Sequence, residues 1–251
     1  MAKITVVGLG PGSLLDMSER AKQAIAAAEV VAGYTTYIKL VEPLLAGKEI
    51  IGTGMMQEID RCRAAVEAAA GGRETVVISS GDAGVYGMAG LVLELILNLP
   101  KEKRPTYGGA VAGISAVNVA ASVLGAPLMH DFAVISLSNL LTPWELIKKR
   151  VEAAGAADFV LALYNPKSKK RTQNIEEVRE ILLKYRAPET PVGIVTAASR
   201  AGEKKVLSTL DHFTQEDIKM FSLVIIGNSQ TFVREGYMIT PRGYGQKEAG
   251  L

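Results

Sequence analysis

Residues 75–90 read TVVISSGDAGVYGMAG, and this stretch decides the fold. A run of mostly β-branched residues ends in two serines, and glycines then recur at every third position, at Gly81, Gly84, Gly87 and Gly90. A buried strand that stops in a glycine-rich turn before a helical pattern is typical of a parallel α/β sheet. Open sheets of this kind bind ligands at the carboxyl ends of their strands. The stretch therefore predicts both a fold class and the edge of the sheet where a site belongs.

Short apolar runs alternate with helical patterns throughout the first half of the chain. This alternation predicts an α/β domain with a mostly parallel sheet. We expect strands at 4–7, 29–32, 48–51, 75–78 and 106–111, and helices at 18–28, 36–45, 58–70, 84–97 and 115–124.

The sequence GAP at 125–127 interrupts the alternation, and we place a domain boundary there. The prediction is an amino-terminal α/β domain over 1–126 and a carboxyl-terminal α/β domain over 127–251. The last three expected strands have little helix between them, which favours an antiparallel, mixed second sheet. In this half we expect strands at 132–137, 159–163, 192–196, 205–210, 223–226 and 231–234, and helices at 143–154 and 175–185.

Composition excludes several classes of protein. The chain has 251 residues, 48% hydrophobic and 22% charged, with a formal net charge of +2, which indicates neither a nucleic-acid nor a membrane partner. Its single cysteine, Cys62, excludes an intrachain disulfide or a cysteine metal cluster, and we expect no metal site. Residues 105–130 carry no formal charge, but glycines and proline interrupt them as a membrane span. No signal peptide is evident, so we expect a cytoplasmic protein.

The turn GLGPGS at 8–13 follows the first expected strand and raises the possibility of dinucleotide binding. That fingerprint requires G-x-G-x-x-G opening a helix and an acidic residue about 20 positions later. Here the glycines stand at 8, 10 and 12, and Pro11 removes a backbone donor from the turn. Glu29 does lie at a suitable distance, so a nicotinamide-dependent oxidoreductase stays open on these residues.

The Gly81–Asp82 turn is not a phosphate loop, because no Gly-Lys-Ser/Thr follows it. A carboxylate there repels phosphate and suits a ribose hydroxyl, an ammonium or a sulfonium. A third turn, with Ser115, repeats the pattern of strand end and glycine. The residues thus favour a neutral or cationic nucleoside-like cofactor, and a non-catalytic nucleoside-binding module also stays open. We interpret Gly87 and Gly90 as sites of close packing between helix and sheet.

Seven segments together resemble the tetrapyrrole methylase family, from about residue 3 to residue 244. The blocks SGDAGVYGMAG, HDF and LTPW are similar to the branch that methylates C17 of precorrin-3B. The segments are GLGPGS (8–13), SSGDAGVYGMAGLVLE (79–94), GISA (113–116), LGAPLMHDF (124–132), SLSNLLTPW (136–144), YNPKS (164–168) and MITPRGY (238–244).

The resemblance implies a homodimeric enzyme that binds S-adenosylmethionine (SAM) in a cleft between two α/β domains. The implied reaction is methylation at C17 of precorrin-3B or cobalt-precorrin-3, coupled to ring contraction, in cobalamin biosynthesis. The implied substrate is a tetrapyrrole with acetate and propionate arms, with or without cobalt. A sister methylase that acts at another ring carbon is the nearest alternative.

The resemblance also implies a set of cofactor-binding residues. Ala112 and Ala83 depart from prolines found in many relatives of the broader family, so the turn at Ala112 is expected to be less rigid. The implied cofactor contacts are Pro11, Ser80, Gly81, Asp82, Val85, Ser115, Ala116, Tyr164, Asn165 and Ala198.

Methyl transfer from a sulfonium needs positioning and a dry pocket more than it needs acid–base groups. Ring contraction calls for a proton donor or acceptor, and the candidates are His130, Asp131, Ser138 and Thr142. A linker hydrogen bond for the first two and helix capping for the last two are equally open. Arginine binds carboxylates through two parallel hydrogen bonds. The candidates for binding the substrate's arms, which solvated surface charge also explains, are Lys167, Arg171, Arg200 and Arg242.

Overall fold

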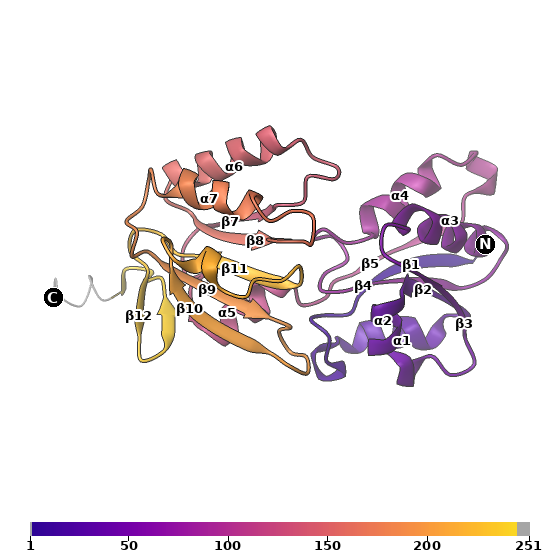
Figure 1. The fold of residues 1–251 in the computed structure, drawn as a ribbon. Coiled ribbons are helices and arrows are strands. Elements are labelled where there is room, and N and C mark those ends of the chain that lie inside the picture. Colours follow the sequence, from indigo (N-terminus) through magenta and orange to yellow (C-terminus); the bar gives the residue numbers. More distant parts are fainter. Residues whose placement is uncertain (1, 245–251) are drawn as a thin grey trace. The chain divides into compact units, whose positions relative to one another are not determined.

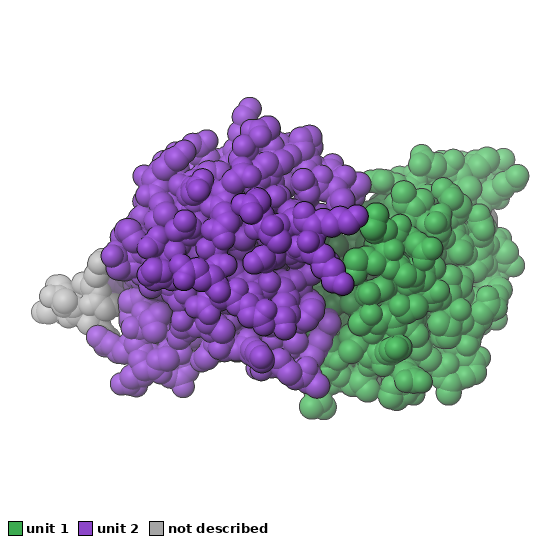
Figure 2. All heavy atoms as spheres, in the orientation of Figure 1, with its two compact units in different colours: residues 1–116 green, residues 117–251 purple. Residues whose placement is uncertain are grey.

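The computed structural model describes residues 2–244. It divides into two compact units, Met1–Ala116 and Val117–Leu251, which Figure 2 colours separately. The division falls at the amino end of helix α5 (Ala116–Leu124), whereas we predicted a boundary just beyond its carboxyl end.

The sheet of the first unit is entirely parallel, as predicted. Its strand order is β3-β2-β4-β1-β5, and all four neighbouring pairs run in the same direction (Figure 1). All carboxyl ends therefore meet at one edge. The strands are β1 (Lys3–Gly8), β2 (Val30–Tyr34), β3 (Glu49–Thr53), β4 (Thr75–Ser79) and β5 (Thr106–Val111).

Helices cover both faces of this sheet because its central strands are apolar on both sides. Val7 and Ile78 pack with α1 (Glu19–Ala27) and α2 (Thr35–Leu40). Val6 and Val77 point to the other face and pack with α3 (Glu58–Ala70) and α4 (Ala89–Leu97) (Figure 1). Adjacent strand residues thus serve opposite cores, as the period of two requires. Three short 3-10 helices complete the unit: η1 (Leu14–Asp16), η2 (Glu42–Leu44) and η3 (Lys101–Lys103).

Two helix predictions in this unit were wrong at their ends. The helix expected over 84–97 begins only at Ala89, because Tyr86 adopts a left-handed conformation with φ 53° that breaks the helical path. The helix expected over 36–45 ends at Leu40 and gives way to η2, which has a proline in its first turn. Close packing at Gly90 was also wrong, because an added Cβ would have no atom within 4 Å.

The second unit contains the predicted mixed sheet, in the order β10-β9-β11-β8-β7. β7 and β8 are parallel, and the other three pairings are antiparallel. The carboxyl ends of β7, β8 and β9 therefore share one edge with the amino ends of β10 and β11. The strands are β7 (Phe132–Ser136), β8 (Val160–Tyr164), β9 (Pro191–Thr196), β10 (Lys204–Thr209) and β11 (Ser222–Ile226).

Helices α6 (Trp144–Ala156) and α7 (Asn174–Leu182) cover one face of this sheet, and α5 lies on the other (Figure 1). The apolar sides of α6 and α7 form the core of this unit with Leu161, Leu163 and Ile194. On the α5 face, Gly193 of β9 makes room for Leu124, because an added Cβ would lie 2.5 Å from both methyl carbons of that leucine. A short 3-10 helix, η4 (Phe213–Gln215), follows β10.

A small three-stranded sheet was only partly predicted. It consists of β12 (Phe232–Arg234), β13 (Tyr237–Ile239) and β6 (Gly125–Ala126). β12 was expected, but β13 and β6 are too short to show a period of two. Glu235 and Gly236, both with positive φ, form the tight turn between β12 and β13. Within residues 2–244 no helix has the length and apolarity needed to cross a membrane.

Cys62 tests the core of the first unit, because its side chain is fully buried and burial raises the pKa of its thiol to about 11. A thiol with this pKa and no exposure is inert, since the thiolate is the reactive form. We expect native protein at pH 8 to react with a thiol reagent only as fast as the protein unfolds. Unfolded protein should react at once with one equivalent of the reagent. Stoichiometric labelling of the native protein within seconds would contradict this placement.

Candidate functional site

Three glycine backbones touch at the carboxyl edge of the first sheet. Gly8 ends β1, Gly81 follows β4 and Gly113 follows β5. A Cβ built on Gly113 would lie 2.2 Å from the Gly81 carbonyl oxygen and 2.7 Å from the Gly8 carbonyl carbon. A Cβ on Gly8 would lie 2.7 Å from the Gly113 nitrogen. Gly8 and Gly113 are therefore required because any side chain would push the strand ends apart. Gly81 is favoured for another reason, its positive φ of 67°, since an added Cβ there would make only ordinary contacts.

Backbone hydrogen bonds join the first of these loops to the second. Gly10 donates to the Gly81 oxygen at 3.0 Å, and Gly81 donates back to the Gly10 oxygen at 2.8 Å. Pro11 is buried next to this pair. The GLGPGS turn is thus fixed by contact with the Gly-Asp turn, and it leads into the short 3-10 helix η1, whereas a dinucleotide loop opens an α-helix directly.

The carboxylate of Asp82 joins the second loop to the third. Its Oδ1 accepts hydrogen bonds from the backbone N–H groups of Gly84 at 2.8 Å and Val85 at 3.2 Å. Its Oδ2 accepts one from the Gly113 N–H at 3.0 Å. Three backbone donors occupy most of the accepting capacity of one carboxylate. Asp82 thus positions the second and third loops relative to each other. Its contact with a cofactor stays a prediction.

Strained backbone marks the same edges. Among residues 2–244, seven residues other than glycine have positive φ, and five of them lie in the connections that follow β3, β4, β8 and β9. Such conformations are uncommon and gather at functional sites. This signal was invisible in the sequence because none of the five is a glycine. The five are Met56, Tyr86, Asn165, Ala197 and Ser199.

In the second unit, Tyr164 and Asn165 lie at the carboxyl end of β8 and bind neighbouring elements. The Tyr164 hydroxyl accepts a hydrogen bond from the Val117 N–H in the first turn of α5 at 3.0 Å. The Asn165 amide donates to the Ser136 hydroxyl at the end of β7 at 3.0 Å. These two predicted site residues therefore join α5 and β7 to the carboxyl end of β8.

Ala198 lies at the same edge, just beyond β9, between two residues of positive φ. The Ser199 N–H donates to Glu203 Oε2 at 2.7 Å, and the Arg200 N–H donates to the Ala197 oxygen at 3.0 Å. These bonds shape a tight connection to β10. Ala198 thus lies at the same edge as Tyr164 and Asn165, because β8 and β9 run in the same direction.

The four acid–base candidates do not lie together. His130 and Asp131 precede β7, and the Asp131 N–H donates to His130 Nδ1 at 2.9 Å, as a linker hydrogen bond would. Ser138 and Thr142 follow β7, at the carboxyl edge. At about 3.3 Å per residue, the five residues of β7 separate the two pairs by about 15 Å or more. The two pairs therefore cannot act at one point, and a catalytic role for any of the four stays a prediction.

The basic candidates also separate. Lys167 and Arg171 lie in the loop after β8, and both are half-buried. Arg200 lies after β9 and is half-buried, whereas Arg242 is exposed beyond β13. Only the first three are therefore positioned at the carboxyl edge of the second sheet.

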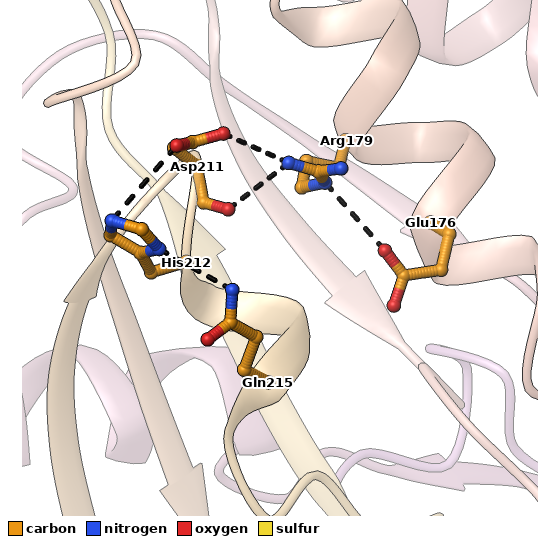
Figure 3. Close-up of polar contacts among 5 residues, drawn as sticks. All are labelled: Glu176, Arg179, Asp211, His212 and Gln215. Carbon is orange, nitrogen blue, oxygen red and sulfur yellow. Dashed lines mark hydrogen bonds and ion pairs between the residues drawn. The ribbon is translucent and has the colours of Figure 1, made fainter.

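A second polar cluster lies at the opposite edge of that sheet (Figure 3). Arg179 of α7 donates to Asp211 Oδ1 at 2.9 Å and lies 3.6 Å from Glu176, while His212 Nε2 lies 3.9 Å from Asp211 Oδ2. Asp211 follows β10, which runs antiparallel to β9, so it lies at the edge opposite the carboxyl end of β9. The cluster is thus remote from Asn165 and Ala198 within the unit, and it fastens α7 to the turn before η4.

Exposed apolar side chains at the two carboxyl edges were missed by the sequence analysis. Beyond the first sheet, the side chains of Leu15, Met55, Met56 and Ile114 are 93%, 51%, 77% and 43% exposed. Large apolar groups gathered on loops at a ligand-binding edge mark contact surfaces. Their position next to predicted turns was the available signal. The matching residues of the second unit are Leu140, Leu141, Met220 and Phe221.

Known proteins resemble the chain in sequence. The Tetrapyrrole (Corrin/Porphyrin) Methylases profile matches residues 3–214. The probable cobalt-factor III C(17)-methyltransferase of Salmonella typhimurium is 50% identical over 241 residues, covering 96% of this chain and 99% of that relative. The cobalt-factor III methyltransferase of Priestia megaterium is 50% identical over 246 residues, covering 98% of this chain, and the chain spans 46% of that relative's length.

The fold is also shared with a solved structure. The crystal structure of the methyltransferase CobJ superimposes with a TM-score of 0.89 at 34% identity. The match covers 96% of this chain and 100% of that one. This agreement confirms the predicted α/β architecture with a parallel and a mixed sheet.

Gly113→Ala tests the contact between the three glycine backbones. Because its Cβ would meet backbone atoms that cannot rotate away, we expect the free energy of unfolding to fall by about 1–3 kcal/mol. The melting temperature and the affinity for S-adenosylhomocysteine should fall together. Gly90→Ala is the matched control: its Cβ meets nothing and alanine favours helix, so stability should stay or rise by up to about 1 kcal/mol. Equal behaviour of the two variants would contradict the account.

Asp82→Ala tests the carboxylate that joins the second and third loops. The change leaves three backbone N–H groups without their acceptor, so we expect a loss of about 1–3 kcal/mol in stability. Asp82→Asn keeps one acceptor oxygen and should lose less. Calorimetric titration with S-adenosylhomocysteine should show weaker binding in the order wild type, Asn, Ala. Unchanged affinity in the folded Ala variant would rule out a role for Asp82 in the cofactor site.

Proposed function

The chain belongs to the tetrapyrrole methylase family, and we propose that it transfers a methyl group from SAM to C17 of precorrin-3B or its cobalt-containing counterpart. In this proposal the transfer is coupled to ring contraction in cobalamin biosynthesis. Both curated relatives reported above carry cobalt-factor III in their names, so the cobalt form is the first substrate to test. The observation that carries the proposal is the close-packed glycine edge, found in a chain so similar to C17-methyltransferases.

The residues at the glycine edge fit SAM better than they fit a phosphate-bearing cofactor. At Gly8 and Gly113 the neighbouring backbone fills the space that a Cβ would occupy, so no side chain at these strand ends stands between a ligand and the main chain. A carboxylate, Asp82, lies in the turn where a pyrophosphate would need a positive site. We propose that the cofactor is held by Pro11, Ser80, Gly81, Asp82, Val85, Ser115 and Ala116 from the first unit and by Tyr164, Asn165 and Ala198 from the second.

SAM supplies an electrophilic methyl group on a sulfonium whose leaving group is neutral. The chain's own task is therefore to bind and orient the cofactor and the substrate and to exclude water. Asp82 does this indirectly, by fixing the loops at Gly84 and Gly113 against each other. Tyr164 does it by holding the first turn of α5.

Ring contraction requires a proton to be moved, and the positions of the four candidate residues relative to β7 favour one pair. Ser138 and Thr142 lie at the carboxyl edge that carries Asn165, whereas His130 and Asp131 lie at the other end of β7. We propose the first pair for the site. A homodimer, which the resemblance implies, and a cytoplasmic location complete the proposal.

Methyl transfer is tested with SAM carrying a carbon-13 methyl group and either cobalt-factor III or precorrin-3B, with NMR and mass analysis of the product. We expect one labelled methyl group at C17 of a contracted ring. A label at another carbon would identify a sister methylase and overturn the assignment.

Cofactor choice is tested separately by thermal unfolding. S-adenosylhomocysteine at saturating concentration should raise the melting temperature, because it binds the folded state only. NAD should leave it unchanged. Stabilisation by NAD alone would instead support an oxidoreductase.

A further inference from the structure

Arg171 lies in the loop after β8 with an incompletely satisfied guanidinium. Its Nη2 donates to the Asn165 carbonyl oxygen at 2.7 Å. Its backbone pairs with that of Ser168 through hydrogen bonds of 3.0 and 3.2 Å, which fix the loop. Its Nε is buried without a hydrogen-bond partner. The side chain is therefore held in place by one donor while others stay available.

No carboxylate of the described chain forms an ion pair with Arg171. Three other arginines do pair: Arg63 with Asp60, Arg73 with Glu49, and Arg179 with Asp211. Burial lowers the pKa of Arg171 from its usual value, with no opposing contribution from an acidic neighbour. A partly desolvated cation without a counter-charge is unfavourable. An anion brought by a ligand would supply that charge.

Arg61 also lacks a carboxylate, but its environment differs. It is 4% exposed, and its guanidinium bonds the Thr53 hydroxyl at 2.6 Å beneath the loops of the first unit. Arg171 is only half-buried and keeps a surface that a ligand can reach. Access therefore favours Arg171 as the anion-binding residue.

The neighbours of Arg171 along the carboxyl edge are apolar and exposed. The loop after β7 carries Leu140 and Leu141, which are 72% and 99% exposed, and Phe221 just before β11 is 59% exposed. β8 lies between β7 and β11 in the sheet. A cation flanked by apolar groups suits a ligand with a flat apolar body and anionic arms.

We infer that Arg171 binds a carboxylate arm of the macrocyclic substrate. This inference rests on the proposed function, which supplies a tetrapyrrole with acetate and propionate arms. Through Nη2 the same guanidinium holds the Asn165 carbonyl, in a loop proposed to contact the cofactor. Substrate and cofactor sites thus meet at one side chain.

The test is a fluorescence titration of the full chain with uroporphyrin III, a stable macrocycle with acetate and propionate arms on every pyrrole ring. Arg171→Gln should weaken binding about tenfold or more, and Arg171→Lys should lie between it and wild type because the lysine lacks the planar fork. Lys169→Gln is the matched control, since it removes one exposed positive charge from the same loop. It should change affinity less than about twofold at physiological salt, where surface charge is screened.

Mesoporphyrin, which has only two propionate arms, should lose less affinity on Arg171→Gln than uroporphyrin III does. A cooperative thermal unfolding transition of each variant shows that the protein is folded. Equal loss in Arg171→Gln and Lys169→Gln would overturn the inference, as would an unchanged affinity for uroporphyrin in Arg171→Gln or no binding by wild type. Failure of methyl transfer at C17, with the uroporphyrin result as expected, would refute the proposed function and leave Arg171 as a carboxylate-binding residue.

Discussion

Direct contact between the backbones at Gly8, Gly81 and Gly113 is the constraint on which the rest of the structure depends. A single methyl group on Gly113 would overlap the Gly81 carbonyl oxygen, so β1, β4 and β5 can end together only without side chains at Gly8 and Gly113. Asp82 then fastens the loops across 31 residues of sequence by accepting the Gly113 N–H. Together these contacts place three loops along one edge and leave their outer surfaces for a ligand.

The fold could be predicted largely because its strands are apolar on both faces or alternate clearly. The helix α3 (Glu58–Ala70) and the strand β5 (Thr106–Val111) were predicted to the residue. The start of α4 could not be, because Tyr86 is an ordinary residue in a left-handed conformation. β6, with two residues, and β13, with three, are too short to show periodicity, and they form through pairing in the order β12-β13-β6.

The site was predictable as a set of turns but not as a set of contacts. Sequence placed Asp82 in a turn, and only the structure shows that its carboxylate bonds a backbone group of the next loop. Sequence named His130 and Ser138 as separate candidates, and only the structure shows that β7 lies between them. The missing counter-charge of Arg171 was likewise invisible, because acidic residues near in sequence are not near in space. Hydrogen-bond partners and charge balance depend on tertiary contacts, which single-sequence patterns do not encode.

A crystal structure of the chain with S-adenosylhomocysteine tests the central claim most directly. We predict that the nucleoside lies at the carboxyl edge of the first sheet, against the backbone of residues 80–85 and 113–116. Asp82 should keep its hydrogen bonds to Gly84 and Gly113 in that complex. A ligand bound at the opposite edge of the sheet, or bound with the Asp82–Gly113 hydrogen bond broken, would contradict the account.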